Sequence, residues 1–165
     1  MRPTSSPVPF VLLQGFTLVE LVMCMVLMGI ISTSVLPKFF NLTSYKEKAL
    51  FDDTLNAIRY AQKLAVATGC NVQFVTSSNQ FSLKRPAGRG TCTSVTSADF
   101  SSNVVQPASS GNYTGSQSGI NLSTITLYFN ALGIIASSTG TGISVGASHA
   151  ITVVPSTGFV YDSSP

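Results

Sequence analysis

The amino-acid sequence predicts an α+β fold in which a long N-terminal α-helix, with a hydrophobic half and an amphipathic half, packs on a C-terminal antiparallel β-sheet domain. Residues 16–36 are predominantly apolar and carry one charged side chain, Glu20. Apolar residues then recur at helical spacing as far as residue 67. Beyond Gly69 this period ends, and short runs of β-branched and aromatic residues alternate with turn-forming residues, a pattern typical of antiparallel strands.

The composition is typical of an ordered, extracytoplasmic chain. Of the 165 residues, 44% are hydrophobic and only 9% are charged, whereas charged residues make up about 25% of an ordinary soluble domain. Ser, Thr, Gly and Asn supply much of the polarity of the C-terminal half. The net charge is +3, and the sequence contains no run of like charges long enough to form a nucleic-acid-binding arm. Composition therefore points to no partner and argues against nucleic acid.

The apolar run at residues 16–36 has the length of a membrane-spanning helix. Its 21 residues would cross a hydrocarbon core of about 30 Å. A secretory signal peptide and a buried core helix are the alternatives. A signal peptide has a shorter apolar region followed by a small-residue cleavage site, whereas Pro37, Lys38 and two phenylalanines follow this run. We therefore expect residues 16–37 to form a hydrophobic transmembrane helix.

The same helix is predicted to continue through an amphipathic half, residues 38–69, with Gly69 as its C-terminal cap. One stripe of apolar side chains should face a core, and charged side chains should fill most of the remaining face. The stripe consists of Phe51, Leu55, Ile58, Ala61 and Ala65, and the charged face of Lys46, Glu47, Lys48, Asp52, Asp53, Arg59 and Lys63.

Glu20 needs a partner if residues 16–36 lie in a membrane. A carboxylate in that environment costs about 2.5 to 3.5 kcal/mol even on lenient insertion scales. Cleavage after Gly15 would create an α-amino group on Phe16, one helical turn from Glu20 of the same chain and within reach of Glu20 of a neighbouring chain. The alternative is a polar residue that is tolerated near the membrane edge.

Residues 15–21, with the sequence GFTLVEL, resemble the processing and methylation motif of type IV prepilins and type II secretion pseudopilins. The resemblance implies a pilin-like fold and a leader peptide at residues 1–15. It implies that a prepilin peptidase cuts between Gly15 and Phe16 and that the new Phe16 amine is methylated. It also implies that Glu20 guides docking of the helix into a filament.

Gly29 and Pro37 fall where members of this family commonly carry residues that loosen the helix. Proline lacks the N–H that would bond to the carbonyl of Thr33, so Pro37 should kink the helix. Either residue alone is also ordinary in a membrane helix.

The basic residues near the apolar run depart from the family pattern. Family leaders usually carry basic residues just before the cleavage glycine, but Arg2 is the only charged residue in residues 1–15. Lys38, Lys46 and Lys48 follow the run, and this bias would place the C-terminal domain in the cytoplasm. The resemblance implies the reverse, a bacterial inner-membrane protein with residues 70–165 in the periplasm. A misassigned start codon would explain both departures.

Cys70 and Cys92 form a candidate disulfide in the region after the helix. Such a bond requires an oxidising compartment such as the bacterial periplasm. Two free core cysteines or a metal-binding pair are the alternatives, but a metal lacks a ligand set because His149 is the sole histidine and the acidic residues are scattered. Cys24, inside the apolar run, is interpreted as a small packing residue.

Six short runs after residue 70 are predicted to be strands, with turns at residues 132–133 and 156–158. Residues 94–123 are rich in Ser, Gly, Asn and Thr, and they are predicted to form a long surface excursion that adds little to the core. The predicted strands are residues 72–76, 81–84, 124–130, 133–136, 151–154 and 159–161.

Lys84, Arg85 and Arg89 form a small basic cluster interrupted by proline and glycine. If exposed, the cluster could contact an anionic ligand such as DNA or a glycan. The alternative is a solvated loop, because only three charges are involved and no aromatic residue is interleaved for base stacking.

Residues 128–133 followed by residues 150–161 resemble the C-terminal sheet of minor pseudopilins and minor pilins of the GspH and FimT type. Together with the cysteine arrangement, they resemble minor pilins of the mannose-sensitive haemagglutinin (MSHA) pilus system. The resemblance implies a minor pilin that assembles with other pilin subunits on an inner-membrane platform and reaches the cell surface. A type II secretion pseudopilin that serves protein export and a non-polymerising, membrane-anchored binding protein are the alternatives.

An enzymatic function has little support in the sequence. His149 is the sole imidazole, and no serine lies in a Gly-x-Ser-x-Gly nucleophile motif. We therefore predict a structural protein without a cofactor or a metal.

Overall fold

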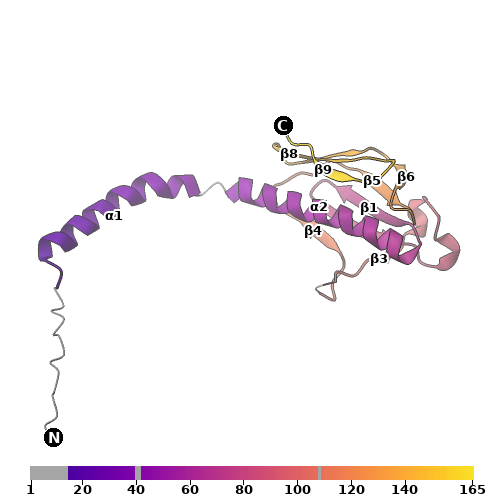
Figure 1. Ribbon diagram of the computed structural model, residues 1–165, viewed down its shortest axis with the longest axis horizontal. Coiled ribbons are helices and arrows are strands. Elements are labelled where there is room, and N and C mark those ends of the chain that lie inside the picture. Colours follow the sequence, from indigo (N-terminus) through magenta and orange to yellow (C-terminus); the bar gives the residue numbers. More distant parts are fainter. Residues whose placement is uncertain (1–14, 40–41, 108) are drawn as a thin grey trace, which may run out of the picture. The chain divides into compact units, whose positions relative to one another are not determined.

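The computed structural model describes residues 15–39, 42–107 and 109–165, and for residues 34–39 it describes the backbone alone. Contacts divide the chain into two units, residues 1–41 and residues 42–165, and each is described by itself. The first unit contains helix α1, Leu18–Phe39. The second contains helix α2, Leu42–Thr68, and the strands (Figure 1). The predicted α+β class is confirmed.

The two helices begin and end close to the predicted limits. Gly69 has a φ of 68° and its N–H donates to the carbonyl of Ala65 at 3.0 Å, so the predicted glycine cap of α2 is confirmed. The sequence also predicts that one helix runs without interruption through both halves. Residues 40–41, where α1 and α2 would join, lie outside the described residues.

The first sheet has the strand order β3-β2-β1-β5-β6, and every pairing in it is antiparallel. Its centre is β1, Val72–Ser77, between β2, Gln80–Arg85, and β5, Thr126–Phe129. The outer strand β6 spans Ile135–Ser138. Two short strands, β3 at Ser102–Asn103 and β4 at Thr114–Ser116, both pair with β2.

The second sheet is a smaller antiparallel meander with the order β7-β8-β9. Its strands are β7 at Gly142–Val145, β8 at His149–Val153 and β9 at Val160–Asp162. An isolated bridge between Leu122 and Val145 links β7 to the chain that precedes β5.

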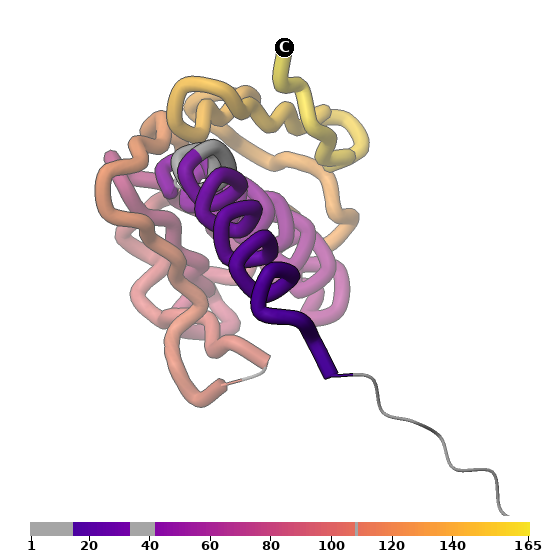
Figure 2. Tube along the Cα trace, turned by 90° about the vertical axis from the view of Figure 1, so that its left-hand side faces the viewer, coloured from indigo at the N-terminus to yellow at the C-terminus, as the bar shows by residue number. Residues whose placement is uncertain are grey.

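One face of α2 packs against strands of both sheets. In Figure 2 the yellow C-terminal strands and the pink strands near residues 72–116 lie on different sides of this helix. Apolar side chains from both sheets, such as Phe74 of β1 and Ile151 of β8, complete one continuous core with it. The residues of α2 that are buried are Glu47, Leu50, Phe51, Thr54, Ala57, Ile58, Ala61 and Ala65, and Leu55 is partly buried.

Glu47 is an exception to the predicted charged face of α2. Only 7% of its surface is exposed, and its Oε1 atom accepts the N–H of Ser148 at 2.7 Å. Ser148 lies in the turn between β7 and β8, where Gly146 has a φ of 62°. A side chain at Gly146 would collide with the Glu47 carboxyl group. The prediction that Glu47 faces solvent is therefore wrong, because this turn covers it and supplies a hydrogen-bond donor.

The prediction for residues 94–123 is also wrong in part. This segment contributes β3, β4 and the short helix η2, Ser97–Asp99. It buries four apolar side chains, each no more than 4% exposed: Phe100, Val104, Ile120 and Leu122. They form two short groups, near residues 100–104 and 120–122, in a segment that is otherwise mostly polar, so the local composition hides their contribution to the core.

The six predicted strands are present with small shifts, and β3, β4 and β7 are additions. β6 begins at Ile135, two residues later than predicted, because the Asn130 side chain extends the preceding turn. Its Oδ1 atom accepts the N–H groups of Leu132 at 2.9 Å and Ile134 at 3.3 Å. β7 is four residues long and alternates buried Ile143 and Val145 with exposed neighbours, so its apolar signal is too short to predict.

We expect Glu47→Ala to lower the free energy of unfolding by about 2 kcal/mol, because the Ser148 N–H would lose its acceptor. Asp52→Ala is the matched control, since Asp52 pairs with Lys48 on the exposed side of the same helix. That control should change stability by less than about 0.5 kcal/mol. Urea denaturation of the full chain in detergent, followed by circular dichroism, measures both. Equal effects of the two substitutions would contradict the assigned role of Glu47.

Candidate functional site

The candidate site is the N-terminal end of α1 together with residues 15–17, the described residues that precede the helix. Thr17 caps the helix, because its Oγ1 atom accepts the N–H of Glu20 at 3.2 Å and its carbonyl accepts the N–H of Leu21 at 3.1 Å. A threonine followed three residues later by a glutamate is the residue pair of a capping box. Thr17 therefore fixes the start of the helix at Leu18 and leaves Phe16 outside it.

The peptide bond between Gly15 and Phe16 lies just outside this helix. Both residues are exposed and non-helical, and the Phe16 side chain is 81% exposed. A peptidase would therefore not have to unwind α1 to reach this bond.

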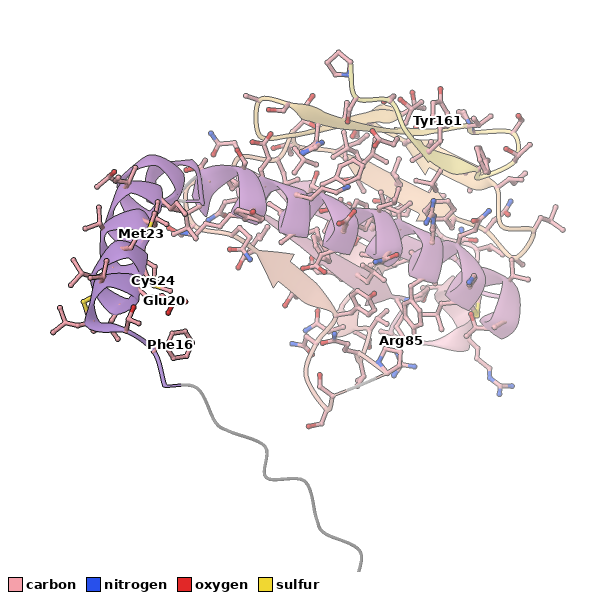
Figure 3. All side chains as sticks on the ribbon, turned by 60° about the vertical axis from the view of Figure 1, so that its left-hand side comes forward. Phe16, Glu20, Met23, Cys24, Arg85 and Tyr161 are labelled. Atoms are coloured by element: carbon pink, nitrogen blue, oxygen red, sulfur yellow. A yellow bond between two sulfur atoms is a disulfide. The ribbon has the colours of Figure 1, made fainter. Side chains whose placement is uncertain are left out.

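Glu20 lies in the first turn of α1, four residues after Phe16. Figure 3 shows the two side chains on the same side of the helix start. Glu20 is exposed, and its apolar neighbours are exposed as well. Residues 15–33 contain no basic side chain. The exposed apolar neighbours are Leu18, Val19, Leu21, Val22 and Met23.

Two comparisons with known proteins identify the family. Residues 14–36 match the family model described as the prokaryotic N-terminal methylation motif, a range that includes Gly15, Phe16 and Glu20. A relative, the type IV narrow pilus major component PilA5 of Thermus thermophilus, is 34% identical over 107 residues, which make up 64% of this chain and 89% of the relative.

The chain belongs to the type IV pilin family. No solved structure matches this pilin. The family match agrees with the resemblance seen at residues 15–21 and with the α+β fold. Thr17 is the residue of this site that sequence reasoning missed, although its spacing from Glu20 is a recognisable capping signal.

The predicted membrane span of this pilin covers residues 16–36. In the portion of the chain that the structure describes, no helix has the combined length and hydropathy of a membrane span. The side chains of residues 34–36 belong to the predicted span and lie outside the described residues.

The two predicted loosening residues both lie within α1. The backbone remains helical from Leu18 through Phe39, and a side chain at Gly29 would meet nothing within 4 Å. The side chain of Pro37 is outside the described residues, and the kink remains a prediction.

The structure pairs Cys70 with Cys92, with their Cα atoms 4.5 Å apart. The bond connects the end of α2 to the short helix η1, Arg89–Thr91. Asn71 holds the same junction, because its N–H donates to the carbonyl of Cys92 at 2.7 Å and its Nδ2 to that of Ser94 at 2.9 Å. Cys24, in contrast, is exposed on α1, so the packing role predicted for it is not found within the single chain.

The basic cluster predicted from the sequence is divided by the fold. Arg85 and Arg89 line one pocket at the end of α2, whereas Lys84 does not. The side chains of successive strand residues point to opposite faces of a sheet, and Lys84 and Arg85 are consecutive in β2.

His149 and Tyr113 both lie in aromatic contacts of the second unit. The His149 ring packs against Phe51 with 5.0 Å between ring centroids. Burial raises the pKa of Tyr113, and the nearby Tyr60 and Asp53 add to this effect. Among the residues that the structure describes, no group of three His, Cys, Asp or Glu side chains could hold a metal ion.

We expect reduction of the Cys70–Cys92 bond to lower the free energy of unfolding by about 3 kcal/mol, since the bond closes a loop with a sequence separation of 22. Urea denaturation of the full chain with and without reductant, in a Cys24→Ala background, measures the difference. Reductant should have no effect when Cys70 and Cys92 are both replaced by serine. An unchanged midpoint in the chain that keeps both cysteines would refute the prediction.

Proposed function

We propose that this type IV pilin is made as an inner-membrane precursor, is cut between Gly15 and Phe16 by a prepilin peptidase, and is methylated on the new Phe16 amine. The match of residues 14–36 to the N-terminal methylation motif supports both steps. The exposed, non-helical position of the Gly15–Phe16 bond is compatible with the cut.

The observation that carries the proposal is the surface of α1. Every described side chain of this helix, from Leu18 to Thr33, is exposed, and most of them are apolar. A contiguous apolar surface of this kind marks a helix that is covered by a membrane or by other protein chains. In the proposal, residues 16–36 lie first in the lipid and then in a bundle of like helices. Because both environments are apolar, the transfer requires no new hydrophobic driving force.

Glu20 sets the axial register of that bundle. Its carboxylate costs about 2.5 to 3.5 kcal/mol at the centre of a bilayer when it has no partner. The amine created at Phe16 is one helical turn away and can offset this cost within the chain. In the bundle, Glu20 of one subunit pairs with the Phe16 amine of the next, and breaking such a pair leaves an uncompensated charge in apolar surroundings.

The subunit serves a pilus in this proposal and begins as a single-pass inner-membrane protein. Its second unit lies in the periplasm, where oxidising conditions favour the Cys70–Cys92 bond. Other pilin subunits and an inner-membrane assembly platform are its partners before it reaches the cell surface.

The choice of a pilus over a secretion system rests on the relative, which is named as a component of a type IV narrow pilus. That relative is a major component. The minor role proposed for this chain, and the mannose-sensitive haemagglutinin system, rest on the resemblance at residues 128–133 and 150–161 alone. A type II secretion pseudopilin would share the same N-terminal end.

The test of this mechanism is Glu20→Gln. Glutamine can serve the same position of a capping box, so this substitution keeps the helix start and removes only the charge. We expect the variant to accumulate in the inner membrane at the level of the native protein and to fall at least tenfold in sheared filaments. Immunoblots of membrane and filament fractions from the native host measure both quantities.

Cys24→Ala is the matched control, because Cys24 is exposed one turn further along the same helix and its replacement leaves the Glu20 carboxylate in place. It should enter filaments normally. Normal incorporation of Glu20→Gln would contradict the proposed pairing. Loss of both variants from filaments would also contradict it, because the defect would then not depend on removing the charge of Glu20.

A further inference from the structure

The second unit contains a cavity of about 450 Å³ at the C-terminal end of α2. This volume lies within the range of about 300 to 1,000 Å³ that is usual for small-molecule sites. Tyr60 and Leu64 of α2 form one wall, and Val104 and Val105 form another. The Cys70–Cys92 bond and the loop at residues 86–88 also line it.

Tyr60 is held in place by a second aromatic ring. It stacks on Tyr113 with 4.9 Å between ring centroids and 18° between ring planes. Backbone hydrogen bonds from Tyr113 to Val104 at 2.6 Å and from Val104 to Leu83 at 3.1 Å hold the opposite wall. The apolar part of the cavity is therefore built on ordered elements.

Arg85 lies at the edge of this apolar cavity because of the alternation of β2. Phe81 and Leu83 are 2% and 1% exposed and face the core, and Arg85 is the next residue on that face. Figure 3 shows Arg85 near the last turns of α2. Arg89, at the start of η1, also lines the cavity.

Neither guanidinium group has an acidic partner among the described residues. Asp99 is the sole acid in residues 85–107, and its carboxylate accepts the hydroxyl of Ser94 instead. Two unpaired arginines next to an apolar cavity form a site for an anion, because guanidinium binds carboxylate, sulfonate and phosphate oxygens through two parallel hydrogen bonds.

We propose that this cavity binds a small organic anion. Arg85 and Arg89 hold its charged group, and Leu64, Val104 and Val105 contact its apolar body. The site belongs to the second unit alone and does not depend on processing or assembly at α1. A nucleic acid fits it less well, because affinity for a polyanion comes from many phosphate contacts, whereas this cavity offers two charges beside an apolar hollow.

The test uses two probes with the same ring body, 1-naphthoate and the neutral 1-naphthamide. Each is titrated into the ¹⁵N-labelled full chain in detergent, and the amide signals of Thr68, Asn71 and Ala87 report binding at the cavity. We expect saturable shifts with 1-naphthoate and at least tenfold weaker binding of 1-naphthamide. Shifts confined to α1 would report partition of the probe into the micelle and would overturn the proposal.

Substitutions identify the groups that hold the charge. Arg85→Ala and Arg89→Ala should each raise the dissociation constant for 1-naphthoate about tenfold, the effect of losing a charged hydrogen bond. Lys84→Ala is the matched control, because it removes the same charge from the opposite face of β2 and should leave the constant unchanged.

Three results would overturn the inference: equal binding of the two probes, an equal loss in all three variants, or no binding at millimolar concentration. The comparison of probes uses the unaltered chain, so it remains decisive if a variant folds poorly. Amide signals far from the cavity report whether each variant is folded.

Discussion

The second unit of this type IV pilin depends on the burial of one face of α2 against two separate sheets. The apolar side chains of the helix join those of both sheets in one core. Contacts at both ends of α2 secure this arrangement. Near its start Glu47 accepts a backbone hydrogen bond from the β7–β8 turn, and after its end the Cys70–Cys92 bond holds the segment that carries η1. The cavity with Arg85 and Arg89 lies at this second end.

Helix α1 presents the opposite situation, because its described side chains, at residues 18–33, are all exposed. In the proposed assembly, lipid and then other subunits cover this exposed apolar surface. Glu20 places one carboxylate on this apolar surface, in the first turn of the helix. Thr17 caps the helix by accepting the N–H of Glu20 and so fixes its start at Leu18. The match to the N-terminal methylation motif covers this end of the molecule, whereas the second unit carries the cavity.

Much of the fold could be predicted, because long apolar periodicity and strands rich in β-branched residues are visible locally. The cap at Gly69 and the two turns of the C-terminal strands are examples. The sequence could not show that Glu47 is buried, since a glutamate among lysines has the pattern of a solvated face until a distant turn covers it. The sequence could not show the cavity either. Strand alternation places Arg85 and Lys84 on opposite faces of β2, and only tertiary packing brings Arg85 next to α2.

The mass of the mature protein tests the account most directly. Subunits isolated from filaments of the native host should have the mass of residues 16–165 plus one methyl group, and tandem mass spectrometry should place that group on the α-amine of Phe16. This result would establish the positive terminus on which the proposed pairing of Glu20 depends. A chain that still begins at Met1, or a mature terminus at any other residue, would contradict the account.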